Sequence, residues 1–65
     1  MNGSAREDLS RQRALRLAAR MMRRANVWRR EAAEADERGA DVEAAVLRTC
    51  AEELDSDRHA LLALK

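Results

Sequence analysis

Apolar residues recur every three or four positions over most of the chain, and this pattern predicts two helices. The first apolar line alternates steps of four and three without a break: Ala14, Ala18, Met21, Ala25, Trp28, Ala32 and Ala35. Leu15, Leu17 and Met22 flank this line. Seven consecutive positions on one helical face are typical of a helix that packs against another helix.

A second apolar line follows later in the chain: Ala44, Leu47, Ala51, Leu54, Arg58 and Leu61. The segment 38–41 between the two lines holds the one turn signal, because Gly39 suits the left-handed position that follows a helix. We therefore expect helices over about residues 5–38 and 41–64. The alternative is one unbroken helix of about 60 residues, since a lone glycine costs only about 1 kcal/mol in a helix.

The predicted helix ends carry capping residues. Ser4 is a good N-cap, and Glu7 three residues later completes a capping box. Asp41 is expected to cap the second helix. Residues 1–3 are expected to be frayed.

Folding the second helix back about Gly39 places large side chains opposite small ones. The facing pairs include Ala32 with Leu47, Trp28 with Ala51, Ala25 with Leu54 and Met21 with Arg58. Close packing of two helices needs this alternation. The predicted fold is all-α, an antiparallel two-helix hairpin that forms one domain over residues 1–65, with residues 4–13 overhanging. On its flanks, Arg24 is expected to meet Asp57 and Arg38 to meet Glu43.

Four apolar residues fall outside this seam: Val27, Val42, Ala45 and Val46. A chain of 65 residues buries only a marginal core by itself. We expect these residues to form a protein interface, covered either by a second copy in a dimeric four-helix bundle or by a larger protein.

The charge of the chain is unevenly distributed. Residues 1–30 contain nine arginines and two acidic residues, a net charge of +7, whereas residues 31–65 contain four basic and ten acidic residues, a net charge of −6. Five arginines share the face opposite the apolar line, here called the arginine face: Arg13, Arg16, Arg20, Arg23 and Arg30. This face suits an acidic protein partner, solvent, or the phosphates of a nucleic acid.

Nucleic-acid binding is the alternative function, and two observations weigh against it. The net charge of the whole chain is only +1, and neither phenylalanine nor tyrosine is present for base stacking. The acidic cluster Glu52, Glu53, Asp55 and Asp57 is expected to pair with Arg20, Arg23 and Arg24, or with arginines of a second chain.

The residue types offer little for catalysis or metal binding. One cysteine and one histidine cannot form a disulfide or a Cys/His zinc site within the chain. His59 follows Asp55 by four residues and is expected to form a surface ion pair, without a nucleophile on that face. Cys50 and Trp28 are expected to belong to the core. We therefore expect a non-enzymatic protein with no cofactor, metal or small-molecule substrate.

The composition also bears on location. No stretch approaches the roughly 18 apolar residues of a membrane span, and the lone cysteine fits a reducing compartment. A cytoplasmic protein that does not insert into membranes is expected.

Four short stretches, 28–32, 38–39, 45–47 and 50–54, carry a resemblance. Across residues 27–55 the chain resembles small uncharacterised helical-hairpin proteins of actinobacteria and their phages. The resemblance implies an accessory protein of a phage or mobile element that acts by binding. Together with the pattern it favours a protein–protein interaction module: an adaptor, an inhibitor or an assembly subunit.

Overall fold

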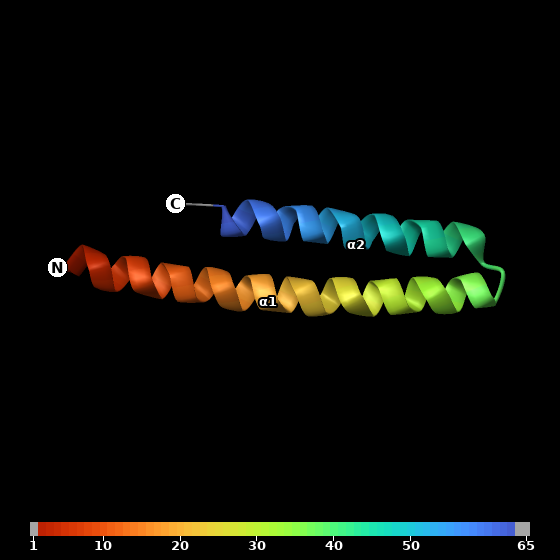
Figure 1. Cartoon of the computed structure of the whole chain (residues 1–65), viewed down its shortest axis with the longest axis horizontal. Helices are drawn as coiled ribbons and strands as arrows, with labels where there is room; N and C mark the ends of the chain where they lie inside the picture. Colours follow the sequence, from red (N-terminus) through yellow and green to blue (C-terminus); the bar gives the residue numbers. More distant parts are fainter. Residues whose placement is uncertain (1, 64–65) are drawn as a thin grey trace.

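The computed structural model describes residues 2–63, with side chains from Arg6 onward, and shows two long helices joined by a tight turn. Helix α1 spans Asn2–Glu37 and helix α2 spans Asp41–Leu62. The helices run antiparallel side by side, and the Cα atoms fill a rod of 57 × 14 × 9 Å (Figure 1). The predicted all-α hairpin is confirmed, and the unbroken single helix is excluded.

The turn is a Schellman motif centred on Gly39. Gly39 has a φ of +77°, and its N–H donates to the carbonyl of Asp36 over 3.0 Å. The N–H of Ala40 donates to the carbonyl of Ala35 over 2.8 Å. These two bonds satisfy carbonyls that a helix end otherwise leaves unpaired, and they require the left-handed conformation that glycine adopts most easily.

The start of each helix differs from the predicted one. Helix α1 begins at Asn2, so Ser4 lies inside its first turn and is not the N-cap. Asn2 and Gly3, which were expected to be frayed, belong to α1, and Met1 lies outside the described residues. Helix α2 begins immediately after the turn: Ala40 occupies the N-cap without a side-chain bond, and Asp41 is the first helical residue. Asp41 still places a negative charge where the helix dipole favours it.

The seam between the helices is built on alanine. The buried apolar residues among the described side chains are Ala18, Ala25, Ala32, Ala35, Ala44 and Ala51. Larger residues alternate with them and are half-buried: Met21, Trp28, Leu47, Leu54, Arg58 and Leu61. Every position of the two predicted apolar lines is therefore at least half-buried, since Ala14 is half-buried too. Small alanines let two helices approach closely, which is why both helices turn these faces inward.

Helix α1 is longer than its partner. With 36 residues against 22, α1 is about 54 Å long and α2 about 33 Å, at 1.5 Å per residue. Helix α1 ends and helix α2 begins at the same turn. The N-terminal part of α1 therefore extends well beyond the C-terminal end of α2 (Figure 1).

Candidate interaction surfaces

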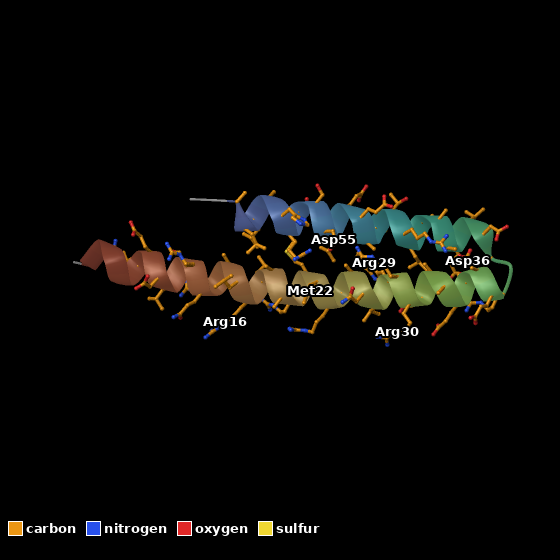
Figure 2. All side chains as sticks on the ribbon, in the orientation of Figure 1. Arg16, Met22, Arg29, Arg30, Asp36 and Asp55 are labelled. Carbon is orange, nitrogen blue, oxygen red and sulfur yellow. The ribbon has the colours of Figure 1, made fainter. Side chains whose placement is uncertain are left out.

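Ion pairs join the two helices along one flank of the hairpin. Arg48 on α2 donates to the carboxylate of Asp36 on α1. Arg29 on α1 donates to the carboxylate of Asp55 on α2. Figure 2 shows Arg29, Asp36 and Asp55 in the space between the ribbons, whereas Arg16 and Arg30 point away from α2.

The two ion pairs indicate which side chains of α1 and α2 lie near each other toward the open end of the hairpin. Arg29 lies seven residues before Asp36, and Asp55 lies seven residues after Arg48. Seven residues are nearly two helical turns, so each step stays on the same side of its helix. From one further step of seven along both helices we infer that Met22 of α1 lies near Leu62 of α2. We call these two rows the ion-pair flank: Leu15, Met22, Arg29 and Asp36 on α1, and Arg48, Asp55 and Leu62 on α2.

The flank ends in apolar side chains that are about half exposed. Leu15, Met22 and Leu62 are 55%, 43% and 45% exposed. We call them the open-end patch, because they lie toward the end of the hairpin that has no turn. Leucine and methionine gain free energy when they leave water, at about 25 cal/mol per Å² of apolar surface. The patch is therefore a candidate contact surface, and the sequence pattern identified its residues Leu15 and Met22 only as flanking the apolar line.

Among the described side chains, the acidic cluster forms none of the ion pairs predicted with Arg20, Arg23 and Arg24. Asp55 meets Arg29 and also Arg58, whose Nε lies 3.6 Å from the Asp55 carboxylate. Arg24, which was expected to meet Asp57, instead lies over the ring of Trp28, with its guanidinium carbon 6.0 Å from the ring centroid. A cation over an indole face is attracted by the ring quadrupole, and this attraction competes with a surface ion pair.

The pair predicted on the opposite flank is present. Arg38 and Glu43 bridge the turn at 3.3 Å. Because both side chains are more than half exposed, their contribution to stability is on the order of a few tenths of a kcal/mol.

Arg58 occupies an unusual place for a charged residue. It lies on the seam, its side chain is 23% exposed, and its buried Nε has no hydrogen-bond partner among the described groups. The apolar stem of an arginine can pack against a seam while its head reaches water. A buried N–H without a partner nevertheless costs on the order of 1–3 kcal/mol.

The predicted protein interface separates into two places. Val42, Ala45 and Val46 are exposed on the outer side of α2, with Val42 79% and Val46 56% exposed. We call these three the turn-end patch. Val27 is exposed too, but it lines a shallow depression with Arg20, Arg23 and Arg24. Val27 therefore lies among arginines of α1, about 15 Å before the end of that helix at 1.5 Å per residue.

All five side chains of the arginine face are exposed. None of them lies within 4 Å of a carboxylate among the described side chains. From Arg13 to Arg30 the face runs for about 26 Å along a helix, at 1.5 Å per residue. It offers a row of guanidinium groups with free donors, suited to carboxylates or phosphates.

His59 and Cys50 show ordinary environments. The Nδ1 of His59 lies 2.8 Å from the carbonyl oxygen of Asp55, and because a carbonyl only accepts, Nδ1 is the protonated nitrogen. The predicted ion pair with the Asp55 carboxylate is not formed. Cys50 is a half-buried free thiol, which agrees with a place at the edge of the seam. Residues 2–63 contain no group of three His, Cys, Asp or Glu side chains arranged to hold a metal ion.

Comparison with known proteins leaves the chain without a family. No family model, no curated protein and no solved structure matches it. The resemblance to actinobacterial and phage hairpin proteins therefore stays a prediction. Across the described part of the chain, neither helix has the length and apolar character needed to cross a bilayer.

Proposed function

We propose that this chain is a protein–protein interaction module that acts by binding and not by catalysis, as an adaptor, inhibitor or assembly subunit. The observation that carries the proposal is the contrast between its core and its surface. The buried apolar residues of the described part are six alanines, and no large side chain there is fully buried. Eight larger apolar side chains, by contrast, are exposed.

Such a core gives a helical hairpin little stability of its own. Alanine removes a small apolar area from water, and chains of this size usually need reinforcement by a metal, a disulfide or a partner. The single cysteine excludes a disulfide within the chain. Contact with another protein would bury the exposed leucines, methionine and valines and stabilise the hairpin by mass action.

The turn-end patch is the proposed docking surface for the partner protein. Val42 and Val46 are one helical turn apart and point away from α1, with Ala45 between them. Valine lowers helix stability relative to alanine by about half a kcal/mol, so two exposed valines in a helix are not explained by helix formation. A shallow apolar surface on a partner helix would cover them, and the adjacent acidic residues Asp41 and Glu43 favour basic groups at its rim.

The test is capture of a partner from the native host with two matched variants. Val42→Glu/Val46→Glu places charge on the turn-end patch, whereas Thr49→Glu/Ser56→Glu adds the same charge to exposed polar positions further along α2. We expect wild type and the Thr49/Ser56 variant to retain the same protein and the Val42/Val46 variant to lose it. Circular dichroism would establish that both variants stay helical. Equal capture by all three chains, or by none, would overturn the proposal.

Nucleic-acid binding through the arginine face is the second candidate, favoured by one observation. Arg20, Arg23 and Arg24 line a common depression, and the arginine face has no carboxylate neighbours among the described side chains. Phosphate binding would weaken steeply with salt. Fluorescence anisotropy of labelled DNA and RNA at two salt concentrations tests it, with Arg16→Glu/Arg20→Glu/Arg23→Glu as the control. Under the main proposal, no salt-dependent binding is expected.

In this proposal the module works in the cytoplasm, where its thiol stays reduced. The phage or mobile-element setting rests on the resemblance alone.

A further inference from the structure

We propose that a second copy of the chain binds over the ion-pair flank, with the two α1 helices antiparallel and a two-fold axis passing between Leu15 and Met22. The surface is distinct from the turn-end patch, so this dimer and the partner-binding function can fail independently. The arginine face lies on the other side of α1 and stays exposed.

The surface area of the hairpin matches what a dimer would bury. The chain exposes 5340 Å² to solvent and has a mass of 7.4 kDa. A folded monomer of that mass exposes about 4,200 Å² by the usual scaling. The excess is about 1,100 Å² per chain, and a stable interface buries about 800 Å² on each partner. One full-length contact with a second copy would therefore bring the exposed surface to an ordinary value.

The chemistry of the ion-pair flank is self-complementary under a two-fold axis. Steps of seven along α1 give the order Asp8, Leu15, Met22, Arg29, which is acidic, apolar, apolar, basic. When an identical helix runs antiparallel beside this row, Leu15 of each copy meets Met22 of the other, and Asp8 comes beside Arg29. In a two-fold contact every pair of neighbouring residues occurs twice, once on each side of the axis. The row therefore suits such a contact, because Leu15 fits Met22 and Asp8 fits Arg29.

Leu62 adds to the same contact. From the seven-residue spacing of the two inter-helix ion pairs we infer that Leu62 lies near Met22, so each copy presents three partly exposed apolar side chains near the axis. Two copies would join six leucine and methionine side chains into one apolar cluster. This cluster would be the large-residue core that the alanine seam lacks.

The overhanging part of α1 also gains a neighbour in the antiparallel arrangement. With the two-fold axis between Leu15 and Met22, residues 6–16 of each copy lie along residues 21–31 of the other α1.

Light scattering gives the first test, because a dimer has twice the 7.4 kDa mass of the chain. We expect wild type to be a dimer and Leu15→Glu/Met22→Glu to lose at least tenfold in dimer affinity. The matched control Val42→Glu/Val46→Glu should keep the dimer mass. A monomeric wild type would overturn the proposal.

Cysteine cross-linking tests the geometry in chains that remain folded. In a Cys50→Ala background, Ala19→Cys lies between Leu15 and Met22 in the sequence and close to the proposed axis. Ala33→Cys lies on the same row fourteen residues further on, and its two copies would be about 40 Å apart at 1.5 Å per residue. We expect oxidation to give a disulfide dimer with Ala19→Cys only. Cross-linking of both variants, of neither, or of Ala33→Cys alone would overturn the antiparallel arrangement.

Discussion

At the turn end of the hairpin, bonds within the chain join α1 to α2, whereas at the open end α1 continues without its partner. The turn end has the Schellman bonds of Gly39 and Ala40 and the ion pair between Asp36 and Arg48. At the open end, Leu15 and Leu62 are about half exposed. The difference shows that the turn end is closed by bonds within a single chain, whereas the open end leaves apolar side chains about half exposed.

The largest effect is expected in the middle of the seam, between the turn end and the open end. Trp28 is the largest seam residue, is half-buried, and carries Arg24 over its ring. Trp28→Ala should lower the free energy of unfolding by roughly 3 kcal/mol, because it removes packing along the middle of the seam. Thermal denaturation followed by circular dichroism measures this. A variant as stable as wild type would show that the seam does not depend on Trp28.

The second largest effect is expected from a substitution at Gly39, which should destabilise the turn end of the hairpin. A Cβ at Gly39 would meet no atom within 4 Å, so the cost of Gly39→Ala comes from its φ of +77°. That cost is about 1–2 kcal/mol in the left-handed region. Gly39→Asn is the matched control and should cost less, since asparagine tolerates that region better. If urea denaturation shows the same decrease in the free energy of unfolding for both variants, backbone conformation at Gly39 is not the cause.

Arg58 allows the open end to be strengthened. Arg58→Met keeps a long apolar side chain on the seam and removes the buried Nε that lacks a partner. Asp55 retains Arg29 as its ion-pair partner. We expect a gain of about 1 kcal/mol in unfolding free energy, measured by urea denaturation. A loss of that size would mean that the pairing of Arg58 with Asp55 outweighs the unpartnered N–H.

The smallest effect is expected from the ion pair near the turn. Asp36 and Arg48 are 42% and 51% exposed, so a double-mutant cycle to alanine should give a coupling of about 0.5 kcal/mol or less, further reduced in high salt. The cycle for Arg29 and Asp55 should give a larger coupling, because Asp55 is only 23% exposed. A larger coupling free energy for Asp36 and Arg48 than for Arg29 and Asp55 would show that burial does not control the strength of these ion pairs.

Much of the fold follows from the sequence, because apolar spacing and one glycine carry the information. The positions on both apolar lines lie in the seam, and Gly39 forms the turn. The start of α1 was misjudged since a good N-cap such as Ser4 is also tolerated inside a first turn. Asp41 failed as a cap because the Schellman motif places Ala40 directly before α2.

Surface contacts were harder to predict than the seam. Helical periodicity placed Arg24 opposite Asp57, but a long arginine side chain can choose among several neighbours, and Trp28 offered an aromatic face. The position of Val27 among arginines could have been predicted from the sequence. Val27 lies seven residues after Arg20 and fourteen after Arg13, so its row already belonged to the arginine face.

The elongated shape also governs how the molecule moves through solution. A rod of 57 × 14 × 9 Å between Cα atoms meets more friction than a sphere of the same mass, and it tumbles faster about its long axis than end over end. Two hairpins stacked antiparallel over their full length would add thickness without adding length. Dimer formation would therefore raise the sedimentation coefficient strongly while the frictional ratio falls toward that of a compact protein.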